Sequence, residues 1–300
     1  MLKEYKTIIL EESNSVGILK LNRPKKLNAF NMQMLEDMLD AIDLVNKNDN
    51  LKSLIITGNG KAFCAGADLS LGENTFDNGF DTKLSHAADF RRDAGGILAL
   101  KIYNSLKPVI AASNGAAVGV GATMQLPADI RIATSNSRYG FVFAKRGIVP
   151  DGCASWFLPK IIGIPRALEL CYSGRVINSD EALKLGLVDY LVEEDQLLDK
   201  AFELSDLYLN SSSPVSVAMT RHMIWSLSAE DSPENAHIIE SKLINSRGAS
   251  EDAKEGVMSF LEKRDAKFSN KISSDLPDDF PWRKSIFKAD KWLLYDFWAI

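Results

Sequence analysis

The sequence predicts an α/β protein whose first two-thirds builds a largely parallel sheet. Short apolar segments with strand-like composition recur at 7–10, 16–21, 54–57, 109–112 and 130–133. Helical apolar periodicity separates several of them, most clearly at 31–45 and 94–106. This alternation is typical of right-handed βαβ units. Beyond Pro165 the pattern changes to helices, which we expect at 165–173, 179–185, 195–210, 214–226, 232–247 and 250–262.

Local signals justify these elements in chain order. A polar turn at 13–15 separates the first two strands. Asn31 is placed to cap the first helix, whose apolar positions repeat about every 3.6 residues: Met34, Leu35, Met38, Leu39, Ile42 and Val45. A glycine-rich turn leads into a helix from about Gly121, and one late strand is expected at 187–192. The polar segment 70–93 is predicted to be a mobile loop or lid.

Composition argues against several classes of function. The 300 residues include 35 basic and 40 acidic side chains, and the net charge of −5 disfavours a nucleic-acid partner, which needs a basic face. Three scattered cysteines without a CxxC pair disfavour a zinc site. The most apolar stretch, 109–126, is interrupted by polar residues and glycines, so we expect no membrane span. The N-terminus MLKEYKTIILEE lacks a signal-peptide pattern, and the expected location is the cytoplasm.

Two turns of small residues follow two of the apolar strands. They read KAFCAGADL at 61–69 and SNGAAVGVGA at 113–122. Small side chains let a ligand approach the backbone, and a turn that enters a helix leaves N–H groups without partners. Two such turns, facing each other, can aim two N–H donors at one oxygen and form an oxyanion hole. Tight packing of a helix on a strand is the alternative explanation for either turn.

Five ordered motifs carry a resemblance to a known family. They are NRPKKLNA at 22–29, AFCAGADL at 62–69, KPVIAASNGAAVGVG at 107–121 followed by ADIRIA at 128–133, GIVPDG at 147–152, and GR at 174–175 with ALKLGLV at 182–188. In order and spacing they resemble the crotonase superfamily, the enoyl-CoA hydratase/isomerase family. The resemblance runs from about residue 7 to residue 265.

The resemblance implies a fold and an assembly. The expected fold is a crotonase-like spiral of ββα repeats over 1–195, with a C-terminal helical trimerisation region at 196–265. The protein is then expected to be a homotrimer or a hexamer. Residues 266–300 are expected to form an aromatic-rich extension, which contains Trp282, Trp292 and Trp298. Because clustered aromatic side chains are rarely left in water, we expect it to pack on the same or a neighbouring subunit, with membrane or partner docking as the alternative.

The resemblance also implies a substrate and a set of contacts. The family binds acyl-CoA thioesters and stabilises the enolate of the thioester carbonyl; coenzyme A enters with the substrate, so no separate cofactor or metal is expected. By position, the two oxyanion donors are the backbone N–H groups of Ala67 and Val120. The implied contacts to CoA and substrate are Lys25, Lys26, Ala29, Ala65, Asp68, Leu69, Phe143, Phe260 and Lys263. For the two lysines, a solvated loop is the alternative.

The carboxylates decide the predicted chemistry. Thr123 and Phe143 stand where two-carboxylate hydratases of the family carry glutamates, whereas Asp151 occupies a third acid position used by isomerases. Asp151 has apolar neighbours at 148–150, and burial beside Phe141 and Phe143 would raise its pKa toward neutrality and suit it to acid/base work. The alternative is that Asp151 caps the helix that follows it.

The predicted function is therefore that of an enoyl-CoA hydratase/isomerase with Asp151 as its single acid/base group. One carboxylate can move a proton from C2 to C4 of a 3-enoyl thioester, so isomerisation is favoured over hydration, for which Thr123 would hold the water. Two alternatives keep the same site. Asp151 is the nucleophile of a CoA thioesterase or dehalogenase in the first. The chain binds CoA without catalysis in the second.

Overall fold

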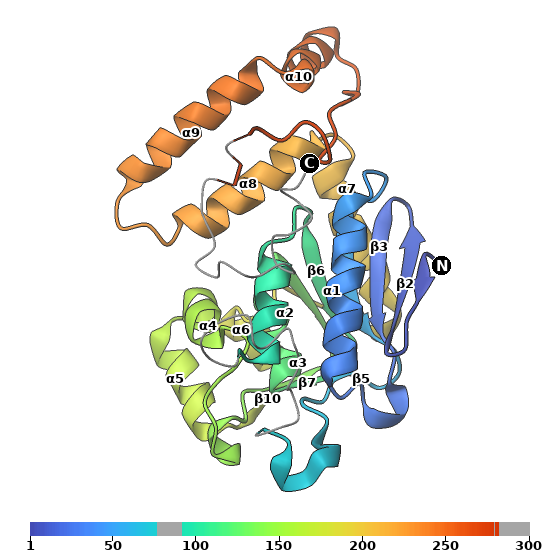
Figure 1. Cartoon of the computed structure of the whole chain (residues 1–300), viewed down its shortest axis with the longest axis vertical. Coiled ribbons are helices and arrows are strands. Elements are labelled where there is room, and N and C mark those ends of the chain that lie inside the picture. Colours follow the sequence, from blue (N-terminus) through green and yellow to red (C-terminus); the bar gives the residue numbers. More distant parts are fainter. Residues whose placement is uncertain (77–91, 279, 282–300) are drawn as a thin grey trace.

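Two sheets of unequal size form the centre of the protein (Figure 1). The computed structural model describes residues 1–76, 92–278 and 280–281. The larger sheet has the order β1-β2-β3-β4-β6-β8-β11, and it is parallel from β3 onward. Its strands are β1 (Lys3–Glu4), β2 (Ile8–Ser13), β3 (Val16–Leu21), β4 (Ser53–Gly58), β6 (Val109–Ser113), β8 (Ile130–Thr134) and β11 (Tyr190–Val192).

The smaller sheet has four strands of three residues in the order β10-β9-β7-β5. They are β5 (Ala62–Cys64), β7 (Ala116–Val118), β9 (Arg138–Gly140) and β10 (Val176–Asn178). Successive pairs β4/β5, β6/β7 and β8/β9 each place one strand in each sheet, which is the winding of a ββα spiral. The sequence analysis missed these four strands, because three residues are too few to show a hydrophobic period.

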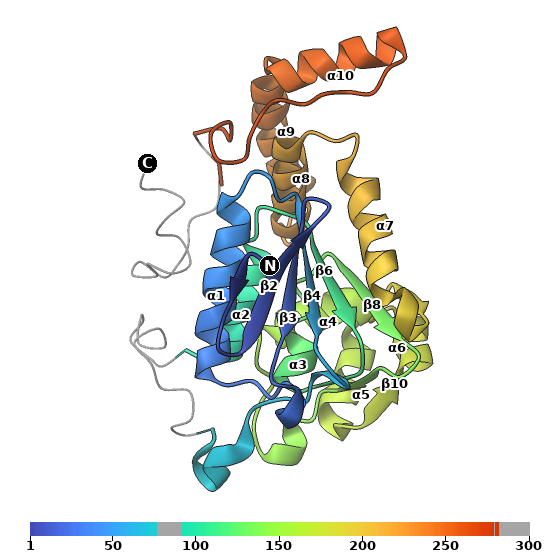
Figure 2. The same cartoon turned by 90° about the vertical axis from the view of Figure 1, so that its right-hand side faces the viewer.

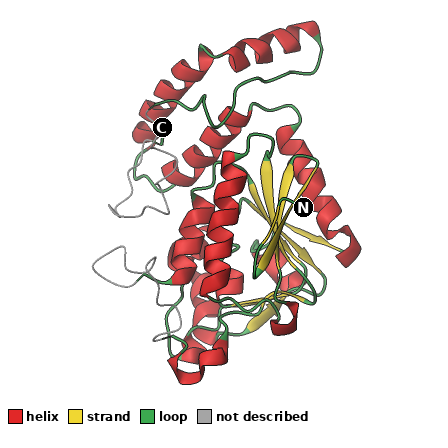
Figure 3. Cartoon of the chain, turned by 45° about the vertical axis from the view of Figure 1, so that its right-hand side comes forward, coloured by secondary structure: helices red, strands yellow, loops and turns green. Residues whose placement is uncertain are grey.

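Helices cover both faces of the larger sheet (Figures 2 and 3). On one face lie α1 (Met32–Lys47) and α2 (Ala94–Tyr103), and on the other lies α7 (Leu197–Leu209). Side chains of β4 alternate between the faces: Leu54 and Ile56 join the core under α1 and α2, whereas Ile55 packs with α7. A parallel sheet buried on both faces explains why its strands read as continuous apolar runs.

The capping prediction for the first helix is confirmed. Asn31 precedes α1, and its Oδ1 accepts a hydrogen bond from the Met34 N–H at 3.0 Å. At the other end of α1, the buried Lys107 ammonium donates to the Val45 and Asn48 carbonyls. A cation at a helix C-terminus satisfies carbonyls that have no partner within the helix. Lys107 thereby fixes the start of β6 against α1.

The helix expected from about Gly121 is shorter than its motif suggests. It is the single turn α3 (Val120–Thr123), and Pro127 follows closely. Because proline disfavours helical geometry in the residue before it, the chain leaves the helix here and enters β8. Three further helices complete this half of the molecule: α4 (Ala154–Ile162), α5 (Ile164–Ser173) and α6 (Ser179–Leu185).

The last helices agree with the sequence analysis within two residues at each boundary. They are α7, α8 (Pro214–Leu227), α9 (Pro233–Gly248) and α10 (Glu251–Glu262). Figures 1 and 2 show α9 and α10 as an arm at the end of the molecule opposite α3. The division at 195 stays a prediction, but α7, which lies just beyond it, packs on the sheet. Most of the segment 70–93 and the tail with Trp282, Trp292 and Trp298 lie outside the described residues.

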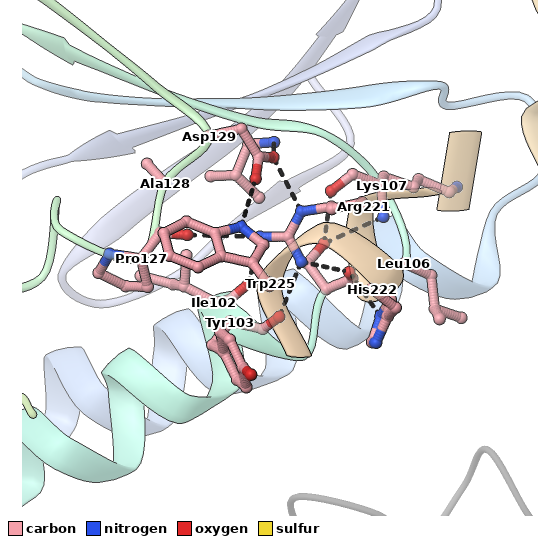
Figure 4. A network of polar contacts seen from close by, with 12 residues as sticks. Ile102, Tyr103, Leu106, Lys107, Pro127, Ala128, Asp129, Arg221, His222 and Trp225 are labelled. Carbon is pink, nitrogen blue, oxygen red and sulfur yellow. Dashed lines mark hydrogen bonds and ion pairs between the residues drawn. The ribbon is translucent and has the colours of Figure 1, made fainter. Parts of the chain in front are cut away.

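Arg221 joins α8 to the core (Figure 4). Its buried guanidinium donates to a carboxylate oxygen of Asp129, just before β8, at 2.8 Å. It also donates to four backbone carbonyls, those of Ile102, Tyr103, Ser105 and Pro127. Asp129 in turn accepts from the Trp225 indole N–H of α8 and from the Val109 N–H of β6. One side chain thus ties a C-terminal helix to the end of α2 and to two strands.

Candidate active site

A cavity of about 320 Å³ lies where the two small-residue turns meet the start of α2. It brings together three of the four predicted catalytic residues, Ala67, Val120 and Asp151. The fourth, Thr123, is fully buried and contacts Asp151 from behind. The complete lining is Phe30, Ala67, Phe76, Arg92, Asp93, Ala94, Gly95, Val120, Ile148, Val149, Pro150 and Asp151.

The backbone N–H of Ala67 has no partner among the described residues. Ala67 forms an isolated parallel bridge with Phe30, in which Phe30 donates to the Gly66 carbonyl and accepts from the Asp68 N–H. In such a bridge the peptide groups on either side face the partner strand, so the central N–H of Ala67 points the other way. Ala67 lines the cavity, and its amide is therefore a donor without an acceptor at the cavity wall.

The backbone N–H of Val120 is in the same situation. Val120 is the first residue of α3, where an amide has no acceptor within the helix, and within the described chain no other acceptor bonds it. The unusual backbone angle of this turn falls on Gly119, with φ of +54°, so a valine side chain is tolerated at the next position. Val120 lines the same cavity as Ala67.

The packing explanation for the turns also holds, at different residues. A Cβ on Gly121 would lie 2.1 Å from the Cys64 carbonyl oxygen, so α3 sits directly on β5. At Gly66, whose φ is +107°, a Cβ would lie 3.1 Å from the Val118 carbonyl oxygen, so any side chain would crowd that carbonyl. The glycines serve the close packing that holds the two turns together, and the N–H groups of Ala67 and Val120 remain at the cavity.

The Asp151 carboxylate is held from two sides. The Thr123 hydroxyl donates to its Oδ1 at 2.6 Å, and a Cβ on Gly95, in the first turn of α2, would lie 3.1 Å from its Cγ. Burial raises the pKa of Asp151 to about 6, the Thr123 hydrogen bond opposes this, and the negative charge of Asp93 adds to it. The side chain does not cap the next helix, because α4 begins after Cys153 without a side-chain cap.

Asp93 is a second carboxylate on the cavity wall, and the sequence analysis missed it. Its side chain caps α2 by accepting from the Gly96 N–H at 2.5 Å, and the same oxygen accepts from the Gly152 N–H at 3.2 Å. Asp93 closes the polar segment 70–93, and no motif marks it. The available signal was its place directly before an apolar helix, which identifies an N-cap and not a site residue.

The loop predicted to bind CoA packs against the first turn. The Ala65 N–H donates to the Leu27 carbonyl, next to the short helix η1 (Pro24–Lys26) that carries Lys25 and Lys26. Arg23 forms an ion pair with Asp68 at 2.6 Å and donates to the Ala29 carbonyl, while Lys26 lies 3.4 Å from Asp68. Lys25 and Leu69 are exposed beside this cluster. The structure therefore brings these six predicted contacts into one region.

Asp68 fastens that region together. Its partial burial favours the protonated form, but hydrogen bonds from Arg23 and from Ser70 outweigh burial and lower the pKa of Asp68 to about 2. Its carboxylate is committed to Arg23, to Lys26 and to the Ser70 N–H at the start of η2 (Leu69–Asn74). Asp68 thus links the loop at 22–29 to the turn at 61–69.

Three predicted contacts do not line the cavity. Phe143, like Phe141, is buried in the main core, and neither lines the cavity. Phe260 belongs to α10 and is 82% exposed, and Lys263 follows at the end of that helix. Because α10 lies at the far end of the molecule, neither residue reaches the cavity of its own chain (Figure 1).

Other features of the described residues do not compete with this site. Among them, no cluster of three potential metal ligands occurs. A larger cavity of about 950 Å³ lies among α7, α8, α9 and the start of α10, and it contains none of the predicted site residues. In the part of the chain that the structure describes, no helix is both long and apolar enough to cross a bilayer.

Comparison with known proteins decides the family. The family model described as enoyl-CoA hydratase/isomerase matches residues 11–271. This chain belongs to the enoyl-CoA hydratase/isomerase family. Enoyl-CoA hydratase AKT3-2 of Alternaria alternata is 40% identical over 86% of this chain and 84% of its own length. The trans-2-decenoyl-[acyl-carrier-protein] isomerase of Streptococcus mutans is 32% identical over 89% of this chain and its whole length.

Solved structures of the family have the same fold. A crystal structure of subunit I of an enoyl-CoA hydratase from Geobacillus kaustophilus superposes with a TM-score of 0.78 at 29% identity, covering 90% of this chain and all of that one. The predicted crotonase fold is confirmed, and the chain is an enzyme of the enoyl-CoA hydratase/isomerase family. Its relatives include both hydratases and isomerases, so family membership alone leaves the reaction open.

Proposed function

We propose that this family member isomerises a 3-enoyl-CoA thioester to the 2-enoyl-CoA thioester. One observation carries the proposal: a partly buried carboxylate and two backbone N–H donors without described partners line the same small cavity. The donors are those of Ala67 and Val120, and the carboxylate is Asp151. This arrangement is suited to forming an enolate and moving one proton along it.

The proposed mechanism uses Asp151 twice. The Ala67 and Val120 amides donate to the thioester oxygen and stabilise the negative charge that develops there. The Asp151 carboxylate removes a proton from C2, and the electron pair delocalises onto that oxygen as an enolate. The protonated Asp151 then returns the proton to C4 while the double bond forms between C2 and C3. The carboxylate is regenerated, and no oxidant, reductant or metal is required.

The pKa of Asp151 supports this role. Burial raises it to about 6, so the group is mostly ionised at pH 7 and is a stronger base than an ordinary aspartate. The Thr123 hydroxyl donates a hydrogen bond to the Asp151 carboxylate and thereby orients it. In this proposal Thr123 positions the base and does not hold a water molecule.

Coenzyme A is proposed to bind across the loop and the turn that Asp68 holds together. Lys25 and Lys26 are exposed there and offer charges for a phosphate, while the backbone at Ala29 and Ala65 lines the approach. Phe260 and Lys263 contribute only if a neighbouring subunit supplies them, because they lie far from the cavity of their own chain. We therefore keep a homotrimer or hexamer as part of the proposal.

Hydration of a 2-enoyl-CoA is the second candidate, because the 40%-identical relative is named an enoyl-CoA hydratase. Hydration requires a bound water that is deprotonated and a proton delivered to C2. Asp151 has access to the cavity for one of these steps, but Thr123 and Phe143 supply no carboxylate for the other. Isomerisation needs only the groups that the structure brings together.

A two-substrate assay separates these candidates. The purified enzyme is incubated with a 3-enoyl-CoA and with the matching 2-trans-enoyl-CoA, beside the variants Asp151→Asn and Asp206→Asn, the latter an exposed aspartate of α7. We expect the 3-enoyl substrate to be converted faster, and Asp151→Asn to lose about 10²–10⁴-fold, as removal of an acid/base group does. Rapid hydration that is unchanged in Asp151→Asn would overturn the proposal.

A further inference from the structure

Asp93 connects the start of α2 to the loop that carries Asp151. Its Oδ2 accepts from the Gly96 N–H of α2 at 2.5 Å and from the Gly152 N–H at 3.2 Å. Gly152 directly follows Asp151, and it lies 59 residues from Asp93 in the chain. The carboxylate is part of the cavity wall. A single side chain therefore bridges two elements that both contact the substrate space.

The loop at Asp151 needs such an anchor because its backbone is unusual. Gly152 and Cys153 have consecutive left-handed conformations, with φ of +62° and +55°. For a residue with a side chain, such as Cys153, this conformation is unfavourable, because the Cβ lies too close to the following carbonyl oxygen. The two residues turn the chain so that Asp151 faces Thr123 while the Gly152 N–H faces Asp93. A Cβ on Gly152 would lie 2.6 Å from the Thr123 hydroxyl, so the turn is also tightly enclosed.

We propose that Asp93 is a positioning residue for Asp151: by holding the Gly152 amide it fixes the acid/base carboxylate over the cavity. The inference rests on the proposed role of Asp151. Helix capping alone does not account for Asp93, because a cap requires one acceptor for an amide of the first turn. The second hydrogen bond, to Gly152, reaches out of α2 to the loop of the acid/base group.

The charged and titratable groups around Asp151 come from four elements. Asp93 and Arg92 precede α2, Cys153 precedes α4, Cys64 lies in β5, and the Thr123 hydroxyl comes from α3. Burial raises the pKa of the Cys153 thiol to about 11 and that of Cys64 to about 12, so both are neutral at pH 7. Asp93 therefore supplies the like charge that opposes ionisation of Asp151.

Two substitutions separate capping from positioning. Asp93→Asn keeps an oxygen acceptor for Gly96 and Gly152 but removes the charge. Asp93→Ser keeps a good helix cap, but its side chain is one atom shorter than that of aspartate and does not span to Gly152. We expect both variants to unfold at the wild-type temperature. A residue that only caps α2 would leave their kinetics unchanged as well.

The expected kinetic changes differ between the two variants. In Asp93→Asn, the acidic inflection of kcat/KM against pH moves to lower pH, because Asp151 loses a repelling charge and becomes a weaker base. In Asp93→Ser, kcat falls by about ten- to a hundred-fold with KM nearly unchanged, since the base is misplaced and not removed. Wild-type kcat and an unshifted inflection in both variants would refute the positioning role.

A second readout does not depend on turnover. The Asp151 carboxyl carbon is titrated by ¹³C NMR in wild type and in Asp93→Asn, with Asp151→Asn used to assign the signal. We expect the Asp151 midpoint to be lower in Asp93→Asn, and an identical midpoint would contradict the inference. If Asp151→Asn is fully active, the proposed function fails. If Asp151→Asn is inactive while the Asp93 variants behave as wild type, only this inference fails.

Discussion

Gly95 gives the Asp151 carboxylate the space it occupies. A Cβ at this position would lie 3.1 Å from Asp151 Cγ, which is tighter than ordinary contact, so the carboxylate would have to move. Gly95→Ala is expected to lower kcat about ten- to a hundred-fold by displacing the base. The same change favours the helix by up to about 1 kcal/mol, so thermal stability should not fall.

The matched control for that substitution is Gly248→Ala. Gly248 is the last residue of α9, and a Cβ there meets no atom within 4 Å. Steady-state kinetics and thermal unfolding are measured for both variants. A Gly95→Ala enzyme with wild-type kcat would show that Asp151 has more freedom than the structure indicates.

Asp68 is expected to make the fold less stable as the pH falls into the acid range. Because its folded-state pKa is lowered to about 2, below the ordinary value of 3.8, its contribution is present above pH 4 and is lost as the pH falls toward 2. The contribution is on the order of 2 kcal/mol. We expect Asp68→Asn to lower the free energy of unfolding at pH 6 and to flatten its decline below pH 4, measured by urea titration. An unchanged acid profile would contradict the role of the Arg23–Asp68 pair.

The site shows which residues a sequence can reveal and which it cannot. Asp151 was predicted because the family resemblance places it at a third acid position, and its apolar neighbours indicated a raised pKa. Asp93 was missed because its contact with Gly152 spans 59 residues and depends on how α2 packs beside α3. Phe143 was expected as a substrate contact, yet it is buried in the core and is not among the residues that line the cavity, because sequence proximity does not fix the direction of a side chain.

At the scale of elements, the sequence analysis predicted the long helices and missed the short strands. The helix capped by Asn31 was found from its apolar repeat, and the four C-terminal helices, each three or more turns long, were also predicted. The strands β5 and β7 position Ala67 and Val120, yet each has three residues and is recognisable only when the sheet has assembled. The two turns of the proposed active site thus depend on the part of the fold that is least visible in the sequence.

Arg221 is expected to be the main attachment of α8 to the core. It satisfies Asp129 and four backbone carbonyls with its side chain nearly inaccessible to solvent (Figure 4). Arg221→Met should destabilise the protein by about 3–5 kcal/mol, because it removes the cation paired with the partly buried Asp129 and the donor to four backbone carbonyls. Lys254→Gln, which removes an exposed ion pair of α10, should leave the unfolding free energy nearly unchanged. Equal stability of both variants would show that α8 is held mainly by apolar contacts.

At the scale of the whole molecule, the arm of α9 and α10 exposes large apolar side chains. Ile244, Val257, Phe260 and Leu261 are each at least 60% exposed. Because such surface is costly to leave in water, we expect the arm to associate with other copies of the chain, as the predicted trimer requires. Phe260→Glu should shift the mass in sedimentation from a multiple of three chains toward that of one chain of 33.1 kDa.

The control for assembly is Tyr172→Glu, an equally drastic change at an exposed position of α5, outside the arm. It should leave the mass unchanged. A wild-type protein that sediments as a single chain at micromolar concentration would contradict the predicted trimer. In that case Phe260 and Lys263 would have no route to the cavity of any subunit.

The most direct measurement of the central claim is exchange of the C2 protons of a bound 3-enoyl-CoA, followed by ¹H NMR in D₂O. The wild-type enzyme is expected to shift the double bond and to move or exchange a C2 proton at the rate of turnover. Asp151→Asn is expected to bind the same thioester with similar affinity and leave its C2 protons in place. Exchange at the wild-type rate in Asp151→Asn would show that another group removes the proton and would contradict the account.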